Sequence, residues 1–118
     1  MTPFYHAQST VNKFGGTVDD YLPIHNWFDN TKEYTGAWNH RALKHHASGI
    51  NECVSIFGDY IINSENKKVP VKYIAEQHVI EDCEFIPTIQ DWLAPLLKHP
   101  EEWMLKVKTK SITAIKIN

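Results

Sequence analysis

Cysteine is scarce in this sequence, and long apolar runs are missing. The 118 residues include two cysteines, Cys53 and Cys83, which are too few for a disulfide framework or a cysteine-rich zinc module. No apolar run approaches the roughly 20 residues that a membrane-spanning helix needs. The start of the chain also lacks the basic and apolar regions of a signal peptide. These absences predict a reduced, cytoplasmic protein that makes no membrane contact. Both cysteines fall on apolar helix arcs, which predicts core residues and not nucleophiles.

The sequence also lacks the short motifs of common catalytic sites. It has no glycine-rich dinucleotide fingerprint, no P-loop, no HExxH zinc motif and no CxxC pair. The His-Asp doublet of helical phosphohydrolases is missing too, since the doublet here is His45-His46. No single motif therefore identifies an activity.

Basic residues are concentrated at the end of an otherwise acidic chain. The formal net charge is −2, yet residues 105–118 hold four lysines and no acid. The first 104 residues carry the remaining 8 basic residues against all 14 acidic ones. This balance argues against nucleic acid as a partner, because an acidic body repels phosphates. The tail partly alternates lysine with apolar residues, which predicts a strand that pairs within the chain or across a homodimer.

Hydrophobic periodicity and capping residues predict the elements of one small domain. We expect helices over 6–14, about 23–32, 35–57, 74–84 and 88–92, and a helical turn over 100–104. Segments 59–63 and 69–73 read as a β-hairpin, with Pro70 confining the second arm to an edge. The expected fold is mostly α with a small β-hairpin, an α+β arrangement. It forms a single compact domain over 1–104, followed by a basic, strand-like extension over 105–118.

Histidine is the residue that stands out, with seven copies in the chain. Two of them have an aspartate four residues on, namely His25 with Asp29 and His78 with Asp82. Positions i and i+4 share a helix face. An imidazole and a carboxylate so placed can bind one divalent ion, or one can orient the other. His78 and Asp82 fall inside the apolar arc of their helix, so they need partners.

The segment 35–57 supplies further histidines. If it forms one helix, His46 falls near the middle of the apolar arc, and His45 lies at its edge, two turns from Glu52. Gly49 lies between them on the same side. A glycine inside a helix costs about 1 kcal/mol relative to alanine. Its small size here predicts either space for a ligand or the close approach of another helix.

Strings across residues 6–104 resemble a small family of uncharacterised bacterial and phage proteins, a domain of unknown function. The resemblance is carried by His6-Ala7 with Ser9, Phe14-Gly15-Gly16, Asp20-Tyr21, Ile24-His25, Trp27-Phe28-Asp29, Lys32, His40-Arg41-Ala42-Leu43, His45-His46, Gly49-Ile50, Glu52, Phe57-Gly58, Asn63-Ser64, Val69-Pro70-Val71, Glu76-Gln77-His78-Val79, Glu81-Asp82, Ile86-Pro87, Asp91-Trp92 and Trp103-Met104. It implies one complete domain and no activity. The chain departs from the family pattern at 64–67, where an acidic-glycine turn is usual, and at 105–118, which extends beyond the usual end.

The leading functional hypothesis is a protein that binds a divalent metal ion, Zn, Mn or Fe. It extends to a metal-dependent hydrolase of a phosphorylated or nucleotide-like molecule. The expected ligands are His25, Asp29, His45, His46, His78 and Asp82, with His45 and His46 as alternatives. Glu52 or Glu81 would act as general base, and Arg41 would face an anionic group.

The alternative is a non-catalytic binding module, related to a phage or its host, whose exposed face binds a partner such as a host protein or a signalling nucleotide. In it the histidine and carboxylate pairs form a buried hydrogen-bonded network that fixes the helices. The partner is thus either a small anionic molecule or a protein.

Overall fold

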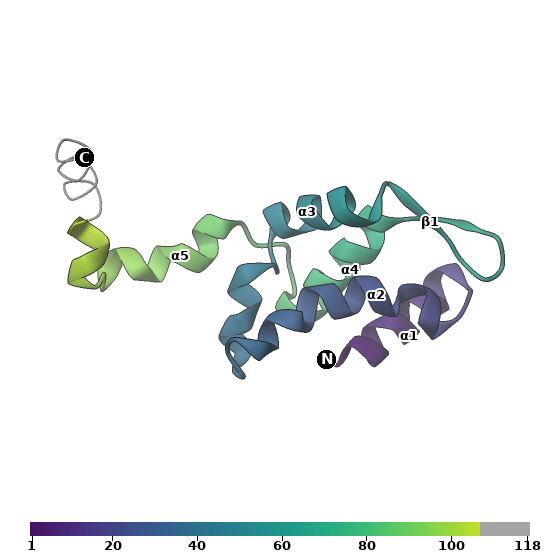
Figure 1. Ribbon diagram of the computed structural model, residues 1–118, viewed down its shortest axis with the longest axis horizontal. Coiled ribbons are helices and arrows are strands. Elements are labelled where there is room, and N and C mark those ends of the chain that lie inside the picture. The colour runs from purple at the N-terminus through teal and green to yellow at the C-terminus, as the bar shows by residue number, and fades with distance from the viewer. Residues whose placement is uncertain (107–118) are drawn as a thin grey trace, which may run out of the picture.

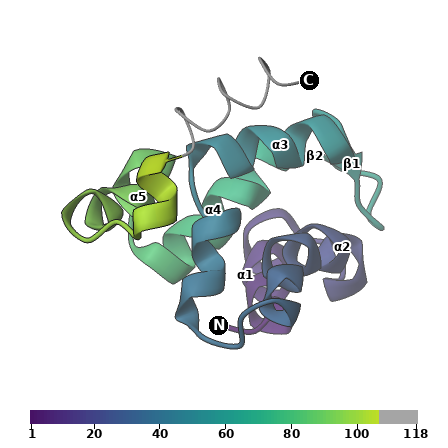
Figure 2. The same ribbon diagram turned by 60° about the vertical axis from the view of Figure 1, so that its left-hand side comes forward.

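Four helices enclose the core in the computed structural model, which describes residues 1–106 (Figure 1). The elements, in chain order, are α1 (Pro3–Phe14), α2 (Val18–Asp29), the 3₁₀ helices η1 (Asn30–Glu33) and η2 (Trp38–Leu43), α3 (Ala47–Phe57), β1 (Tyr60–Ile62), β2 (Lys68–Pro70), α4 (Val71–Cys83) and α5 (Ile89–Lys98). Helix α4 packs against α1, α2 and α3. Figure 2 shows α1 and α2 side by side, with α5 apart from them. The expected mostly α fold with a small hairpin is confirmed.

The first two helices form a hairpin whose turn is set by glycine. Helix α1 begins at Pro3, three residues before the expected start, and ends at Phe14. Its C-cap is Gly15, whose φ of 78° is costly for other residues. Helix α2 then starts from a capping box between Thr17 and Asp20. The prediction that a separate helix begins at Pro23 is wrong. The capping box starts the helix earlier, and Pro23 lies inside it at the loss of one backbone hydrogen bond.

The expected long helix over 35–57 is also wrong, because the chain breaks between η2 and α3. His46 has extended backbone angles, φ −163° and ψ 173°, and its Nδ1 accepts a hydrogen bond from Gly49 N at 2.9 Å. It is therefore the N-cap of α3. The next amide, Ala47 N, donates to Pro87 O at 2.8 Å. These bonds hold a sharp bend that turns His45 toward the core.

Gly49 is required by this bend. A Cβ at Gly49 would lie 1.8 Å from the backbone oxygen of Lys44. The missing side chain therefore admits the chain's own preceding turn, and neither a ligand nor another helix.

The hairpin is shorter than expected, and α4 is longer. Strands β1 and β2 pair antiparallel with Tyr60 opposite Pro70. Residues 71–73, expected in the second strand, open α4 directly after Pro70. The longer helix buries Val71 beside Ile74 and Val79. Burial against the core thus favours helix over a longer hairpin.

Helix α5 extends away from the rest of the structure and has no buried residue (Figure 1). Its capping box between Thr88 and Asp91 confirms the expected start, but the helix runs through Pro95 to Lys98. Residues 102–106 are helical as well, and the rest of the expected extension over 105–118 lies outside the described residues. Within residues 1–106, no helix is long and apolar enough to cross a membrane.

We predict that Gly49→Ala lowers the free energy of unfolding by at least about 1 kcal/mol. The added methyl group would meet the backbone of Lys44 and not a flexible side chain. Urea denaturation measures the change. Gly36→Ala is the matched control. A Cβ there meets nothing within 4 Å, so its effect stays within about 0.5 kcal/mol. Equal stability of the two variants would contradict the bend.

Candidate metal centre

Two buried carboxylates meet at the ends of two helices. Asp29 is the last residue of α2, and Asp82 is the last but one of α4. Their side chains are 5% and 2% exposed. Buried carboxylates cost much free energy unless cations or hydrogen-bond donors lie beside them. The groups that meet them therefore define the chemistry of this site.

His78 contacts both carboxylates through one nitrogen. Its Nε2 lies 3.3 Å from Asp29 Oδ1 and 3.4 Å from Asp82 Oδ2. The other ring nitrogen, Nδ1, lies 2.9 Å from Nδ1 of His25. Which of these two Nδ1 atoms carries the hydrogen decides what His78 presents to the carboxylates.

A chain of hydrogen bonds favours one assignment. The Thr10 hydroxyl lies within donating distance of two acceptors, His6 O and Gln77 Oε1. It therefore donates to one of them and accepts from His25 Nε2 at 2.9 Å. Burial and the neighbouring His78 and His6 lower the pKa of His25 to about 2, so the ring is neutral. Its Nδ1 is then an acceptor, and His78 Nδ1 is the donor.

A neutral His78 consequently directs a lone pair, and no hydrogen, at Asp29 and Asp82. Two carboxylate oxygens and a nitrogen lone pair repel one another unless a cation or an added proton lies among them. Metal-binding histidines typically have this arrangement, in which the second ring N–H donates to a neighbouring group and fixes the ring. The donor set at His78 therefore matches that of a metal ligand.

His45 completes a four-residue group with the same spacing. Its Nε2 lies 3.1 Å from Asp82 Oδ2 and 3.5 Å from Asp29 Oδ1. Ligand atoms about 2.0–2.2 Å from a tetrahedral ion are separated by about 3.3–3.6 Å. The four nitrogen–oxygen distances in the group, from 3.1 to 3.5 Å, match that spacing closely. Asp29, His45, His78 and Asp82, called the central group below, could therefore hold one metal ion.

Two further histidines flank the central group. His40 Nδ1 lies 2.8 Å from Ala37 O, which can only accept, so a neutral His40 bears its lone pair on Nε2. That atom is buried without a hydrogen-bond partner, 3.6 Å from Asp29 Oδ1. His6 repeats the pattern. Its Nδ1 faces Glu81 Oε1 at 2.8 Å, and its Nε2 lies 3.2 Å from Asp82 Oδ1 without a hydrogen bond.

Electrostatics keep both carboxylates ionised. Burial raises the pKa of Asp82, but the imidazoles of His45, His6 and His78, when each presents an N–H to the carboxylate, outweigh burial and hold the pKa far below its usual range. The pKa of Asp29 is likewise lowered, since His45 and His78, when they present an N–H to it, outweigh its burial. For His45, burial lowers the pKa, and the two carboxylates more than reverse this and raise it. The central group thus attracts positive charge strongly.

A second group of His6, His25 and His78 also has its ligand atoms close together. It contains no carboxylate, and the contact between His25 and His78 is already a hydrogen bond. The rings of His6 and His78 stack with centroids 3.8 Å apart. These three imidazoles are better explained as the support of the central group than as a separate ion site.

The expected ligands divide into four that converge and two that do not. Asp29, His45, His78 and Asp82 form the central group. His25 lies behind His78, with both ring nitrogens occupied. His46 is a helix cap whose nitrogens face Gly49 N and Leu43 O, so the structure does not bring it to the carboxylates.

The expected catalytic residues also divide. Glu52 is exposed on α3 and belongs to neither group. Glu81 accepts hydrogen bonds from Ser9, Gln77 and His6, so it orients His6 and is not a free base. Arg41 does reach the site, with Nη2 3.8 Å from Asp82 Oδ1.

Sequence reasoning left His6 and His40 out of the expected ligands. Neither has an acidic residue four positions away, which is the spacing that identified the other pairs. The partners of His6, Glu81 and Asp82, lie in a different helix, 75 and 76 residues along the chain. Searching for pairs four residues apart on one helix cannot find such contacts.

The chain belongs to a protein family described as "Domain of unknown function (DUF6915)". The sequence model of this family matches residues 1–104. No curated protein and no solved structure matches the chain. The family therefore implies no activity, and the geometry of the site carries the functional information.

We predict that His6 and His40 carry their ring hydrogen on Nδ1 and that His25 carries it on Nε2. The reason is that the partners of these atoms act as acceptors. Long-range ¹H–¹⁵N correlation spectra at mildly alkaline pH report the tautomers directly. Exposed His99 is the control, with the mixture of tautomers of a free imidazole. An Nε2 hydrogen on neutral His40 would contradict the assignment.

Proposed function

We propose that the protein binds one divalent transition-metal ion in the central group and uses it to hydrolyse a phosphorylated small molecule. One observation carries the metal part. The bonds from Thr10 through His25 direct the lone pair of His78 at two ionised carboxylates. A metal ion relieves this repulsion and meets all four atoms at suitable spacing.

Charge and donor type indicate which ions suit the site. Asp29 and Asp82 together carry two negative charges, which one divalent cation neutralises. Imidazole nitrogens favour zinc, iron and similar ions over magnesium and calcium, which prefer oxygen donors only. The Nε2 atoms of His6 and His40 are two further donors beside the carboxylates, which suits an ion that takes more than four ligands. Zinc, iron and manganese therefore remain the expected metals.

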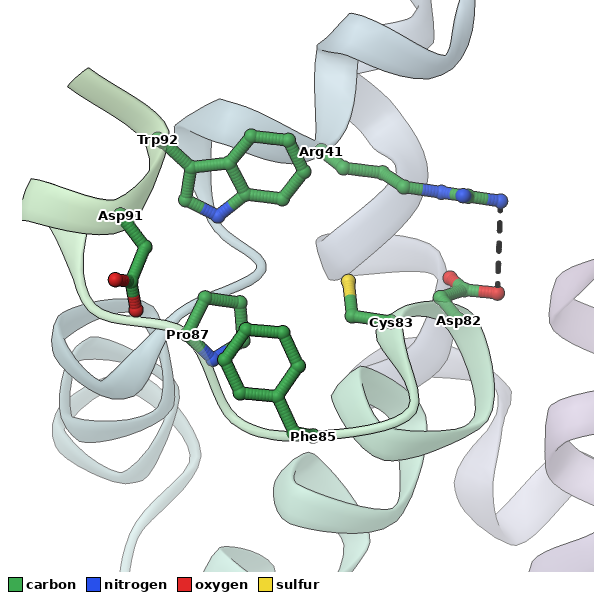
Figure 3. Close-up of a pocket in the computed structure, with 7 residues that line it drawn as sticks. All are labelled: Arg41, Asp82, Cys83, Phe85, Pro87, Asp91 and Trp92. Carbon is green, nitrogen blue, oxygen red and sulfur yellow. Dashed lines mark ion pairs between the residues drawn. The ribbon is translucent and has the colours of Figure 1, made fainter. Parts of the chain in front are cut away.

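The hydrolase part is supported by what lies beside the central group. Asp82 and Arg41 also line a pocket of about 280 Å³ (Figure 3). An ion bound in the central group would supply Lewis acidity and would lower the pKa of a water molecule bound to it. Arg41 would neutralise phosphate oxygens. Hydrolysis forms a bond from water oxygen to phosphorus and breaks the bond to the alcohol oxygen, which leaves with a proton.

A non-catalytic module is the second candidate, and the pKa of His45 favours it. Asp29 and Asp82 raise that pKa, so a protonated His45 can neutralise part of their charge without a metal. The short contact of 3.1 Å between His45 and Asp82 is then an ion-paired hydrogen bond. In this alternative the network only fixes the helices, and the function resides in a surface that binds another protein.

Metal content separates the two candidates. We predict about one equivalent of a transition metal in protein purified without a histidine tag and supplemented during growth, measured by plasma mass spectrometry. His78→Ala and Asp29→Asn lose the metal, because each removes a ligand atom of the central group. His99→Ala keeps it, since His99 lies exposed at the end of α5. Substoichiometric metal after supplementation would favour the structural network.

Hydrolysis has its own test. We predict that the metal-loaded protein releases phosphate from p-nitrophenyl phosphate, and that chelation abolishes turnover until metal is restored. Asp82→Asn falls to the level of the metal-free protein, whereas Glu52→Gln keeps full activity because Glu52 lies outside the group. Full occupancy with metal and no turnover of any phosphomonoester would reject the hydrolase and leave metal binding intact.

A further inference from the structure

We propose that the pocket beside Asp82 is a binding site for a planar ring that carries a phosphate group, such as a mononucleotide. The inference rests on the proposed function, because it names the substrate class of the same site. Its walls come from η2, the end of α4, the connection 84–88 and the start of α5. The lining residues are Arg41, Asp82, Cys83, Phe85, Pro87, Asp91 and Trp92.

The pocket has a charged end and an aromatic end. Figure 3 shows Arg41 and Asp82 together on one side of the pocket and Asp91 on the other side. Trp92 lies above the space between the two sides, and Phe85 lies below it. The pocket surface is mainly apolar apart from these charged groups. A ligand that suits both ends combines an apolar, planar part with an anionic group.

The guanidinium of Arg41 forms only one long ion pair in the described residues. Arg41 is the only arginine of the sequence, and its ion pair with Asp82 is long, at 3.8 Å. Its Nε is buried without a hydrogen-bond partner. A guanidinium carries five donors and matches phosphate oxygens two at a time. The Arg41 side chain is 30% exposed, so its terminal NH groups are accessible to a phosphate.

The aromatic end is held in place and partly uncovered. Trp92 Nε1 donates to His45 O at 2.9 Å, which anchors its indole to the backbone of a central-group residue. Phe85 is 57% exposed although it is strongly apolar. An exposed ring opposite an anchored one offers a stacking surface for a nucleobase. The anchoring of Trp92 also ties the position of this surface to His45.

The pocket directly adjoins the central group. Asp82 belongs to the central group through Oδ2 and to the pocket wall, and Arg41 reaches its Oδ1. A phosphate held by Arg41 would thus lie next to the proposed ion. The aromatic end then lies farther out, where a leaving nucleoside can depart into solvent.

Cys83 provides a direct readout of occupancy. Its thiol is half-buried and lines the pocket, and Figure 3 shows the sulfur directed into the space near Arg41. Cys53 is fully buried and serves as an internal control. Alkylation by N-ethylmaleimide, followed by intact mass, therefore reports on Cys83 in the folded protein.

The experiment uses the metal-loaded full chain with adenosine 5′-monophosphate, adenosine and inorganic phosphate as probes. We expect the monophosphate to bind by calorimetry and to slow alkylation of Cys83. Each of the other two probes binds at least about tenfold more weakly, since one lacks the charge and the other the ring. Equal binding of monophosphate and adenosine would overturn the role of the phosphate.

Two variants separate the ends of the pocket. Arg41→Gln weakens the monophosphate about tenfold or more and leaves adenosine unchanged. Phe85→Ala weakens the monophosphate at least about fivefold and leaves inorganic phosphate unchanged. Lys98→Gln and Phe4→Ala are the matched controls, an exposed cation and a half-exposed ring outside the pocket.

Metal content of every variant is measured in parallel. If the wild type holds metal but no probe binds or protects Cys83, the pocket proposal fails and the metal centre stands. If the protein holds no metal, the proposed function fails instead. Retention of metal by Arg41→Gln with loss of monophosphate binding is the result that supports the pocket.

Discussion

The burial of two aspartates at one point is the constraint on which the rest of the structure depends. Asp29 and Asp82 end helices that are far apart in sequence, and both lie almost entirely out of solvent. Their mutual repulsion has to be offset by what surrounds them, since the interior screens charge poorly. Four imidazoles from α1, η2, α4 and the bend before α3 direct Nε2 atoms toward them. The helices are therefore arranged around a charge, and apolar packing closes around that arrangement.

The irregular parts of the chain follow from the same constraint. A continuous helix through residues 35–57 would be the simplest outcome of its periodicity, yet the chain breaks at His46. The break turns His45 toward the carboxylates, and Gly49 allows the sharp bend that this needs. Natural sequences depart from local rules mainly at functional sites. The departure here lies next to the central group, which is where a functional reason for it would be expected.

Much of the fold, and about half of the site, could be predicted from the sequence. Periodicity and caps located α1, the hairpin, α4 and the start of α5, and the burial of His78 and Asp82 followed from their place on one helix face. The long helix was wrong because imidazole is not among the usual capping side chains, so His46 gave no stop signal. His6 was missed because its contacts span two helices, and local spacing carries no information on such contacts.

The central group is buried against protein on one side and adjoins a pocket on the other. Behind His78, the residues His25, Thr10 and Gln77 form a buried chain of hydrogen bonds. In front, Asp82 adjoins the pocket that Arg41 and Trp92 line. Structural metal sites are surrounded by protein ligands, whereas catalytic ones keep a position that faces an accessible space. A buried rear wall behind His78, together with a front that adjoins a pocket and carries an arginine, is the asymmetry expected of the proposed reaction centre and not of a purely structural network.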